Sequence, residues 1–174
     1  MLSSWGLGFS ATAIQASGTP YLIFRTSWIY GVRGSNFLLT MLRLAKERGR
    51  LKIVDDQFGA PTWARMVAEA TAQVLAQIGS QRLLPQEVSG VYHLTSGGKT
   101  SWHGFAEAIF KCRADLNGGT ASPQLIPIPA SEYPLPAPRP HNSVMSNAKL
   151  QARFGLALPD WKSGLQLCIQ ESAR

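Results

Sequence analysis

Residues 21–31 read YLIFRTSWIYG, and this stretch decides the fold class. Its first four residues form a short, continuous apolar run, which is typical of a strand covered on both faces. The run ends in a charge, two hydroxyls and an indole: Arg25, Thr26, Ser27 and Trp28. Because strands of an α/β sheet carry ligand groups at their carboxyl ends, we expect a binding site here. The indole of Trp28 can stack on a base or a sugar, or it can form the edge of the core.

Helical and strand patterns alternate on both sides of this stretch. We expect further strands over 51–54 and 91–96 and an edge strand, interrupted by proline, over 125–128. Helical spacing or capping predicts helices ending near 17, running from an N-cap at Ser35 to Gly49, and covering 67–78, 102–110, 146–155 and 160–168. The order predicts an α/β fold, with no linker long enough to divide the chain into two domains.

The charge balance leaves several partners open. The 174 residues carry a formal net charge of +7, with a sequence pI of about 9.9. The basic residues gather at the end of one expected helix: Arg43, Lys46, Arg48, Arg50 and Lys52. This cluster is typical of a solvated helix face. Nucleic acid, a small anionic ligand or an acidic partner region would also account for it, although no aromatic residues interleave with the cluster to stack on bases.

Other residues indicate a cytoplasmic chain without a metal site. Cys112 and Cys168 lie far apart in helical patterns, which favours buried thiols in a reducing compartment. No apolar run is long enough to span a membrane. The three histidines have no metal-ligand spacing, and G-x-G-x-x-A at Gly6–Ala11 is a chance match because only five residues precede it. Asp55 and Asp56 are adjacent, so we expect their side chains to diverge as loop caps.

Two loops carry further polar groups. In DQFGAPT, residues 56–62, Gln57 and Thr62 can hydrogen-bond a ligand and Gly59 allows close backbone approach. A rigid turn with Thr62 capping the next helix is the alternative. In PAPRPHNS, prolines stiffen the chain around Arg139, whose guanidinium could meet a phosphate with little loss of entropy. A plain surface loop is the alternative there.

These stretches, in this order, resemble one family. RTSWIYG, SNFLLTMLRLAKER, DQFGAPT, GVYHLTSGGKTSWHGFAEAIF and RPHNS are similar to the C-terminal part of the dTDP-4-dehydrorhamnose reductases, which are extended short-chain dehydrogenases. The resemblance covers about residues 14–169. It implies part of an NAD(P)-binding Rossmann-like domain plus a small substrate-binding domain. The reaction it implies is reduction of dTDP-6-deoxy-L-lyxo-4-hexulose to dTDP-L-rhamnose, with NADPH or NADH as hydride donor, in dTDP-rhamnose and cell-wall polysaccharide biosynthesis.

The resemblance also implies roles for individual residues. Arg25, Thr26 and Ser27 correspond to the strand end near the nicotinamide. The residues it places near the sugar nucleotide are Trp28, Asn36, Phe37, Gln57, Gly59, Pro61, Thr62, Arg139, Asn142 and Ser143. It implies a dTDP-sugar ligand, and neither nucleic acid nor a membrane as partner. A homodimer, or an N-terminal half supplied separately, would fit it, and Mg²⁺ has no support in these residues.

The chain departs from the family near its start. Members carry a glycine-rich turn and a catalytic Y-x-x-x-K motif before the strand that corresponds to 21–24. Counting back places the motif near Ser3 and Leu7, neither of which can donate the proton. We therefore expect an atypical segment over 1–12, a truncation or frame-shift scar, and a reductase-like segment over 13–174. We therefore expect the polypeptide to be an inactive reductase fragment with no catalytic residue. A non-catalytic nucleotide-sugar-binding or regulatory module is the alternative. An exposed apolar strand edge also predicts poor solubility.

Overall fold

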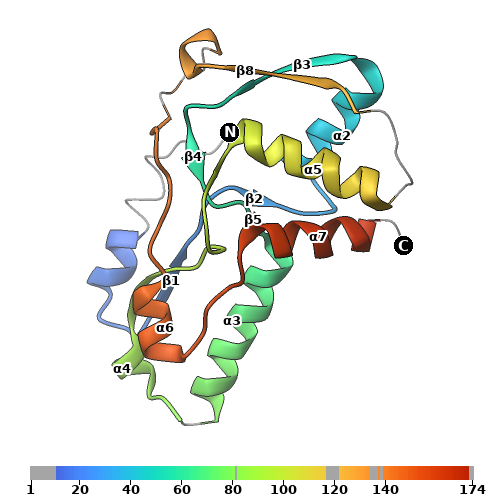
Figure 1. Ribbon diagram of the computed structural model, residues 1–174. Helices are drawn as coiled ribbons and strands as arrows, with labels where there is room; N and C mark the ends of the chain where they lie inside the picture. The colour runs from blue at the N-terminus through green and yellow to red at the C-terminus, as the bar shows by residue number, and fades with distance from the viewer. Residues whose placement is uncertain (1–10, 81, 117–121, 134–136, 138, 173–174) are drawn as a thin grey trace.

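The computed structural model describes residues 11–80, 82–116, 122–133, 137 and 139–172. It shows a mixed α/β fold in which short strands pair two by two and helices pack around them (Figure 1). Two hydrophobic clusters form the core, one at each end of the molecule. Leu158 packs against both clusters and so joins them. The α/β prediction is therefore confirmed.

The first cluster lies around the first strand of the opening stretch, at one end of the molecule. Strand β1 (Leu22–Arg25) pairs in parallel with β6 (Gly90–His93), with Leu22 opposite Gly90. Helices α3 (Ala64–Gly79), α4 (Pro85–Val88) and α6 (Ala148–Phe154) surround this pair (Figure 1). The fully buried residues of the cluster are Val74, Val88, Leu94 and Leu150.

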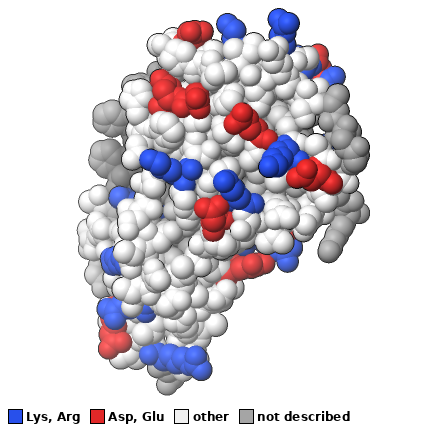
Figure 2. All heavy atoms as spheres, in the orientation of Figure 1, with Lys and Arg blue, Asp and Glu red and all other residues white. Residues whose placement is uncertain are grey.

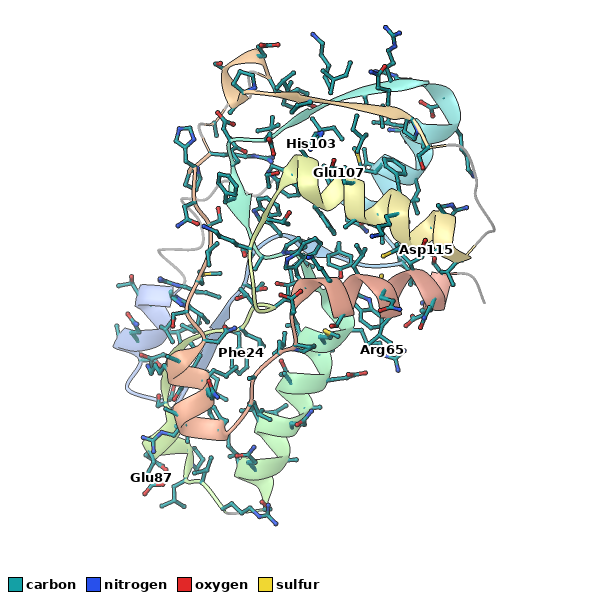
Figure 3. All side chains as sticks on the ribbon, in the orientation of Figure 1. Phe24, Arg65, Glu87, His103, Glu107 and Asp115 are labelled. Carbon is teal, nitrogen blue, oxygen red and sulfur yellow. The ribbon has the colours of Figure 1, made fainter. Side chains whose placement is uncertain are left out.

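The second cluster lies at the other end. Strand β3 (Arg50–Val54) pairs in parallel with β8 (Gln124–Ile128). Helices α2 (Phe37–Glu47), α5 (Trp102–Leu116) and α7 (Trp161–Ser172) pack beside them (Figure 1). Its fully buried members include Tyr30, Leu38, Phe105, Ile109 and Leu165. Arg65 reaches from α3 to Glu171 on α7 at 2.8 Å and thus ties the two ends together on the surface (Figure 3).

Two very short strand pairs lie between the clusters. Strand β2 (Ile29–Tyr30) pairs in parallel with β5 (Thr62–Trp63), and β4 (Phe58–Gly59) pairs antiparallel with β7 (Thr100–Ser101). A 3₁₀ turn, η1 (Ala130–Glu132), follows β8. These pairs bring the segments after β1, β3 and β6 to one place, which is where the candidate site lies.

Several local predictions need correction. The N-cap of α2 is Asn36 rather than Ser35, because its Oδ1 accepts the Leu39 N–H at 3.1 Å. Asn147 precedes α6, although the Ser146 hydroxyl still accepts the Ala148 N–H. The loops at 56–62 and 79–90 contain the short elements β4 and α4. Strand β1 is only half-buried, because β6 is its single strand partner among the described residues.

Other local predictions are confirmed. Residues 11–16 are helical, and Gly18 follows with a φ of 70°. Gly155 closes α6 in the left-handed conformation, and α7 begins after Asp160 with Trp161, Leu165 and Cys168 turned inward. Both cysteines are free. The G-x-G-x-x-A match at Gly6–Ala11 lies almost wholly outside the described residues. No helix in the described ranges is long and apolar enough to cross a membrane.

Candidate functional site

Trp28 is the central residue of the candidate site. It lies three residues after the end of β1 at Arg25, and its backbone takes a φ of 50°, in the left-handed region that bulky side chains rarely adopt. The Thr62 N–H donates to the Trp28 carbonyl at 3.1 Å, which fixes this turn against β5. Strain of this kind persists only where surrounding contacts impose it, and it is concentrated at functional sites.

Two neighbours enclose the Trp28 indole. The Trp102 ring stacks on it with ring centroids 3.5 Å apart and an interplanar angle of 6°. A Cβ on Gly59 would lie 2.3–2.7 Å from three indole atoms, so the ring rests directly on the glycine backbone. Because the Trp102 ring fills one indole face, Gly59 must cover the other. Gly59 thus supplies the close backbone approach that the sequence predicted, but to a side chain of the same protein.

The two loops singled out in the sequence lie side by side. The Phe58 N–H donates to the His141 carbonyl, and the Ser143 N–H donates to the Phe58 carbonyl, each at 2.8 Å. A parallel bridge joins Phe58 to Asn142. Segment 141–143 is therefore held as an added strand beside β4, eighty residues away in sequence. The Asn142 Oδ1 accepts the Val144 N–H at 3.1 Å, which shapes the turn that follows.

Side-chain contacts anchor the loop that carries Gly59. Asp55 accepts a hydrogen bond from the Ser101 hydroxyl, whereas Asp56 accepts one from the Ala130 N–H at 2.9 Å. The two carboxylates thus diverge as loop caps, as predicted. Thr62 does not cap α3: its hydroxyl donates to the Ala60 carbonyl and accepts the Ser96 N–H. Pro61 and Thr62 are fully buried and Gln57 nearly so, and ligand contact by these three residues stays a prediction.

The two residues of the expected Asn36–Phe37 pair have different structural roles at the site. The Phe37 ring lies 4.7 Å from that of Trp102 and stacks on Phe105 behind it, so it supports the Trp28–Trp102 stack. Asn36 uses its amide to close the loop before α2: Nδ2 donates to the carbonyls of Gly31 and Arg33. Its side chain therefore holds backbone in place, and contact with a ligand stays a prediction.

Several predicted residues are free to meet a ligand. Arg25, Thr26 and Arg139 are exposed, and the structure gives their side chains no partner among the described residues. The Ser27 and Ser96 hydroxyls are buried without a hydrogen-bond partner among those residues, and each follows one strand of the β1–β6 pair. Buried polar groups normally have a partner, so this strand end can accept a polar group beyond those of the described residues.

Trp102 is the site residue that the sequence did not single out. It begins α5 and fits that helix's apolar stripe, so its spacing predicted a core position. The structure instead places it half-buried against Trp28. No signal in the spacing separates these two positions, because the antiparallel β4–β7 pairing, which a short loop pattern does not predict, brings Trp102 to Gly59.

The basic cluster lies away from this site. Arg43 and Lys46 line a cavity of about 650 Å³ between α2 and the end of α7, together with Arg33, Arg113 and Glu171. Arg43 also pairs with Glu47 at 3.0 Å. Figure 2 shows Lys and Arg interspersed with Asp and Glu over this view of the surface, as expected of solvated faces. Within the described ranges, no group of His, Cys, Asp and Glu is placed to hold a metal.

Comparison with known proteins finds one family and several relatives that share one name. The family pattern described as RmlD substrate binding domain matches residues 10–174. The chain is 52% identical over 161 residues to a dTDP-4-dehydrorhamnose reductase of Burkholderia thailandensis, covering 91% of this chain and 54% of that protein. It is 42% identical over 159 residues to one from Escherichia coli K12, covering 91% and 52%. The chain thus spans about half the length of the curated relatives it matches.

Solved structures agree. A dTDP-4-dehydrorhamnose reductase of Clostridium acetobutylicum superimposes with a TM-score of 0.78 at 31% identity, covering 94% of this chain and 53% of that chain. One from Bacillus anthracis, in complex with NADP, gives a TM-score of 0.73 at 31% identity, with 92% and 51% covered. These likenesses confirm a Rossmann-like α/β fold.

Proposed function

We propose that this chain, which belongs to the RmlD substrate binding domain family, binds the sugar nucleotide of a dTDP-4-dehydrorhamnose reductase. The observation that carries the proposal is the meeting of three segments that lie far apart in sequence. Trp28 rests on Gly59, and the strand that holds Gly59 pairs with segment 141–143. These are the stretches that the sequence had marked for a sugar nucleotide.

The chemical groups of a sugar nucleotide support separate roles for the residues of the site. A nucleoside diphosphate sugar offers a flat base, a diphosphate and a hydroxyl-rich ring. Arg139 is exposed beside the added strand, and its planar guanidinium is suited to two diphosphate oxygens. Asn142 and Ser143 provide further polar groups on the same strand. Trp28, Trp102 and Phe37 form the aromatic cluster of the site.

We also propose that the carboxyl end of β1 contacts a nicotinamide cofactor, NADPH or NADH. Thr26 is exposed there, and the buried Ser27 hydroxyl lacks a partner among the described residues, so both fit a polar cofactor group. When bound, the cofactor supplies hydride for the reduction of a 4-keto sugar. Arg25, Thr26 and Ser27 would then hold its nicotinamide end beside the sugar site.

We propose that these 174 residues bind the sugar nucleotide but do not catalyse its reduction. None of the four tyrosines is followed at the fourth position by lysine, so the sequence contains no Y-x-x-x-K motif to protonate an alkoxide. The reduction of dTDP-6-deoxy-L-lyxo-4-hexulose to dTDP-L-rhamnose is thus proposed for a protein that includes this chain and a proton donor. A non-catalytic nucleotide-sugar-binding module is the second candidate, and the absence of that motif favours it.

Paired arginine variants test the proposal. We expect dTDP-L-rhamnose to bind the chain, and Arg139→Gln to weaken binding about tenfold, because a charge-assisted bidentate contact is lost. Arg82→Gln is the matched control: Arg82 is also exposed but lies in the loop after α3, away from the site. Equal affinities for both variants, or no binding to the unsubstituted chain, would contradict the proposal. NADPH oxidation by the chain alone would contradict the proposed absence of turnover.

A further inference from the structure

The space between Trp102 and Gly59 is one aromatic ring thick. Trp28 fills it, with Trp102 stacked at 3.5 Å on one indole face and the Gly59 backbone on the other. Neither indole face is free, so in this conformation Trp28 cannot stack on a base or sugar. Stacking by Trp28 was the role expected from the sequence, and the geometry therefore requires another account of how a ligand ring binds.

The two walls of this space are fixed. Trp102 is backed by Phe37, which in turn stacks on Phe105 at 5.5 Å, and Phe105 is fully buried against Tyr30 and Trp161. Gly59 is held by its pairing with Thr100 and by the bridge of its neighbour Phe58 to Asn142. Moving either wall would disturb the core or a strand pair.

The ring between the walls belongs to a connecting turn rather than to the core or to a strand pair. Trp28 lies in the short turn between β1 and β2, beside the exposed residues Thr26 and Ile29. Its backbone φ of 50° is unfavourable for a bulky side chain, and strain of this kind is concentrated at functional sites. No hydrogen bond from the Trp28 indole N–H to a described residue holds it there.

We propose that Trp28 occupies, in the free chain, the slot that receives the flat base of a nucleoside diphosphate sugar. The slot is made by Trp102 and Gly59. The ligand's base replaces the indole between them, and Trp102 is the residue on which the base stacks. A base is as thin as an indole, whereas a puckered sugar is thicker, so the slot selects the base. This inference rests on the proposed function, because that function supplies the nucleotide.

The first arm of the test needs no nucleotide. A stacked tryptophan pair gives an exciton couplet in far-ultraviolet circular dichroism. We expect the couplet in the free chain and its loss in Trp28→Gly. Glycine is chosen because it adopts the left-handed backbone conformation without steric cost. Added indole should restore the couplet in Trp28→Gly but not in the Trp28→Gly, Trp102→Leu double variant. If added indole did not restore the couplet, the proposal that Trp102 and Gly59 form a slot for a flat ring would be wrong.

The second arm uses dTDP as the probe. We expect dTDP to abolish the couplet of the unsubstituted chain, whereas pyrophosphate, which has no ring, leaves it intact. Trp102→Leu should weaken dTDP binding about tenfold, since a stacking surface is lost. Trp28→Gly should tighten it about fivefold, because no indole must be displaced. Leu75→Ala, an exposed site on α3, is the matched control and should leave the affinity unchanged.

The outcomes separate the two claims. Weaker dTDP binding in Trp28→Gly, with Trp102→Leu unchanged, would show that Trp28 is itself the stacking surface and overturn the inference. If dTDP binds neither the unsubstituted chain nor Trp28→Gly, the proposed function fails, and the indole arm still decides whether the slot accepts a flat ring.

Discussion

At the scale of single residues, Trp28 and Gly59 depend on each other. The left-handed backbone at Trp28 costs about 1–2 kcal/mol for a residue with a Cβ, and contacts on both faces of its ring offset that cost. Gly59 makes one of these contacts possible only because it has no side chain. The pair therefore stores strain at the place where three segments meet.

Gly59→Ala tests this dependence. The added methyl would lie 2.3 Å from the nearest indole atom, so we expect the free energy of unfolding to fall by about 1–3 kcal/mol. Gly49→Ala is the matched control, because a Cβ there has no heavy atom within 4 Å. Urea unfolding of both variants gives the comparison. Equal stability of the two would mean that the indole does not rest on Gly59.

A buried hydroxyl provides a second test at this scale. The Tyr30 hydroxyl is buried without a partner among the described residues, whereas the Tyr92 hydroxyl donates to the Val88 carbonyl at 2.7 Å. We expect Tyr30→Phe to raise the free energy of unfolding by about 1 kcal/mol, since an unsatisfied polar group is removed. Tyr92→Phe should lower it by about as much, because the carbonyl loses its donor. The opposite ranking in thermal or urea unfolding would contradict the contacts described for both hydroxyls.

Alkaline pH should destabilise the chain through Cys168. Burial, with a smaller effect of Glu171, raises the pKa of this thiol from 9.0 to about 12. The unfolded thiol loses its proton first, so its contribution to stability is complete below pH about 9 and is lost as pH rises toward 12.

Urea unfolding at pH about 8 and about 10 measures this effect. Cys168 should account for about 1 kcal/mol of the loss between these pH values. Cys168→Ala should therefore lose less stability between them than the unsubstituted chain, whatever its stability at pH about 8. An equal loss in both proteins would show that the thiol is not buried in this way.

The identities of the residues were enough to predict many members of the site, but not how those residues pack against one another. The glycine at 59 and the indole at 28 were recognisable as site residues because both are unusual at a strand end or in a loop. Their contact with each other was not predictable, since it depends on the pairing of β4 with β7. The cap at Asn36 was misplaced by one residue because Ser35 is chemically as good a cap, and only the loop bonds to Gly31 and Arg33 decide between them.

At the scale of elements, helices were predicted more accurately than short strands. Helices α3, α5 and α7 have long amphipathic patterns, which spacing alone reveals. Strands β4 and β7 have two residues each and exist only because distant segments meet. Periodicity requires several repeats, so no pattern of two residues could have predicted them.

Strand β1 gives the prediction that belongs to this scale. Leu22 and Phe24 pack against the cluster around Val74, whereas Ile23 belongs to neither cluster, as expected because alternate residues of a strand face opposite sides. Because this face is half-open, we expect Ile23→Lys to raise the soluble fraction of the expressed chain without loss of its cooperative unfolding. Phe24→Lys should lower the free energy of unfolding, since it places a charge against the half-buried side of the cluster. Equal solubility of Ile23→Lys and the unsubstituted chain would show that this face does not drive association.

At the scale of the whole molecule, the chain joins two cores and places the candidate site between them. One core contains the parallel pair β1–β6 and the other the pair β3–β8. The segments that cross between them, 26–30, 57–63 and 141–147, carry most of the residues marked from the sequence. The chain also spans about half the length of the reductases it matches, so its binding and its chemistry are separate questions.

Calorimetric titration of the 174-residue chain with dTDP tests the central claim most directly, because it measures nucleotide binding without requiring turnover. The account predicts saturable binding at one site per chain, with about tenfold lower affinity in Arg139→Gln. Absence of saturable heat from a cooperatively folded chain would contradict it.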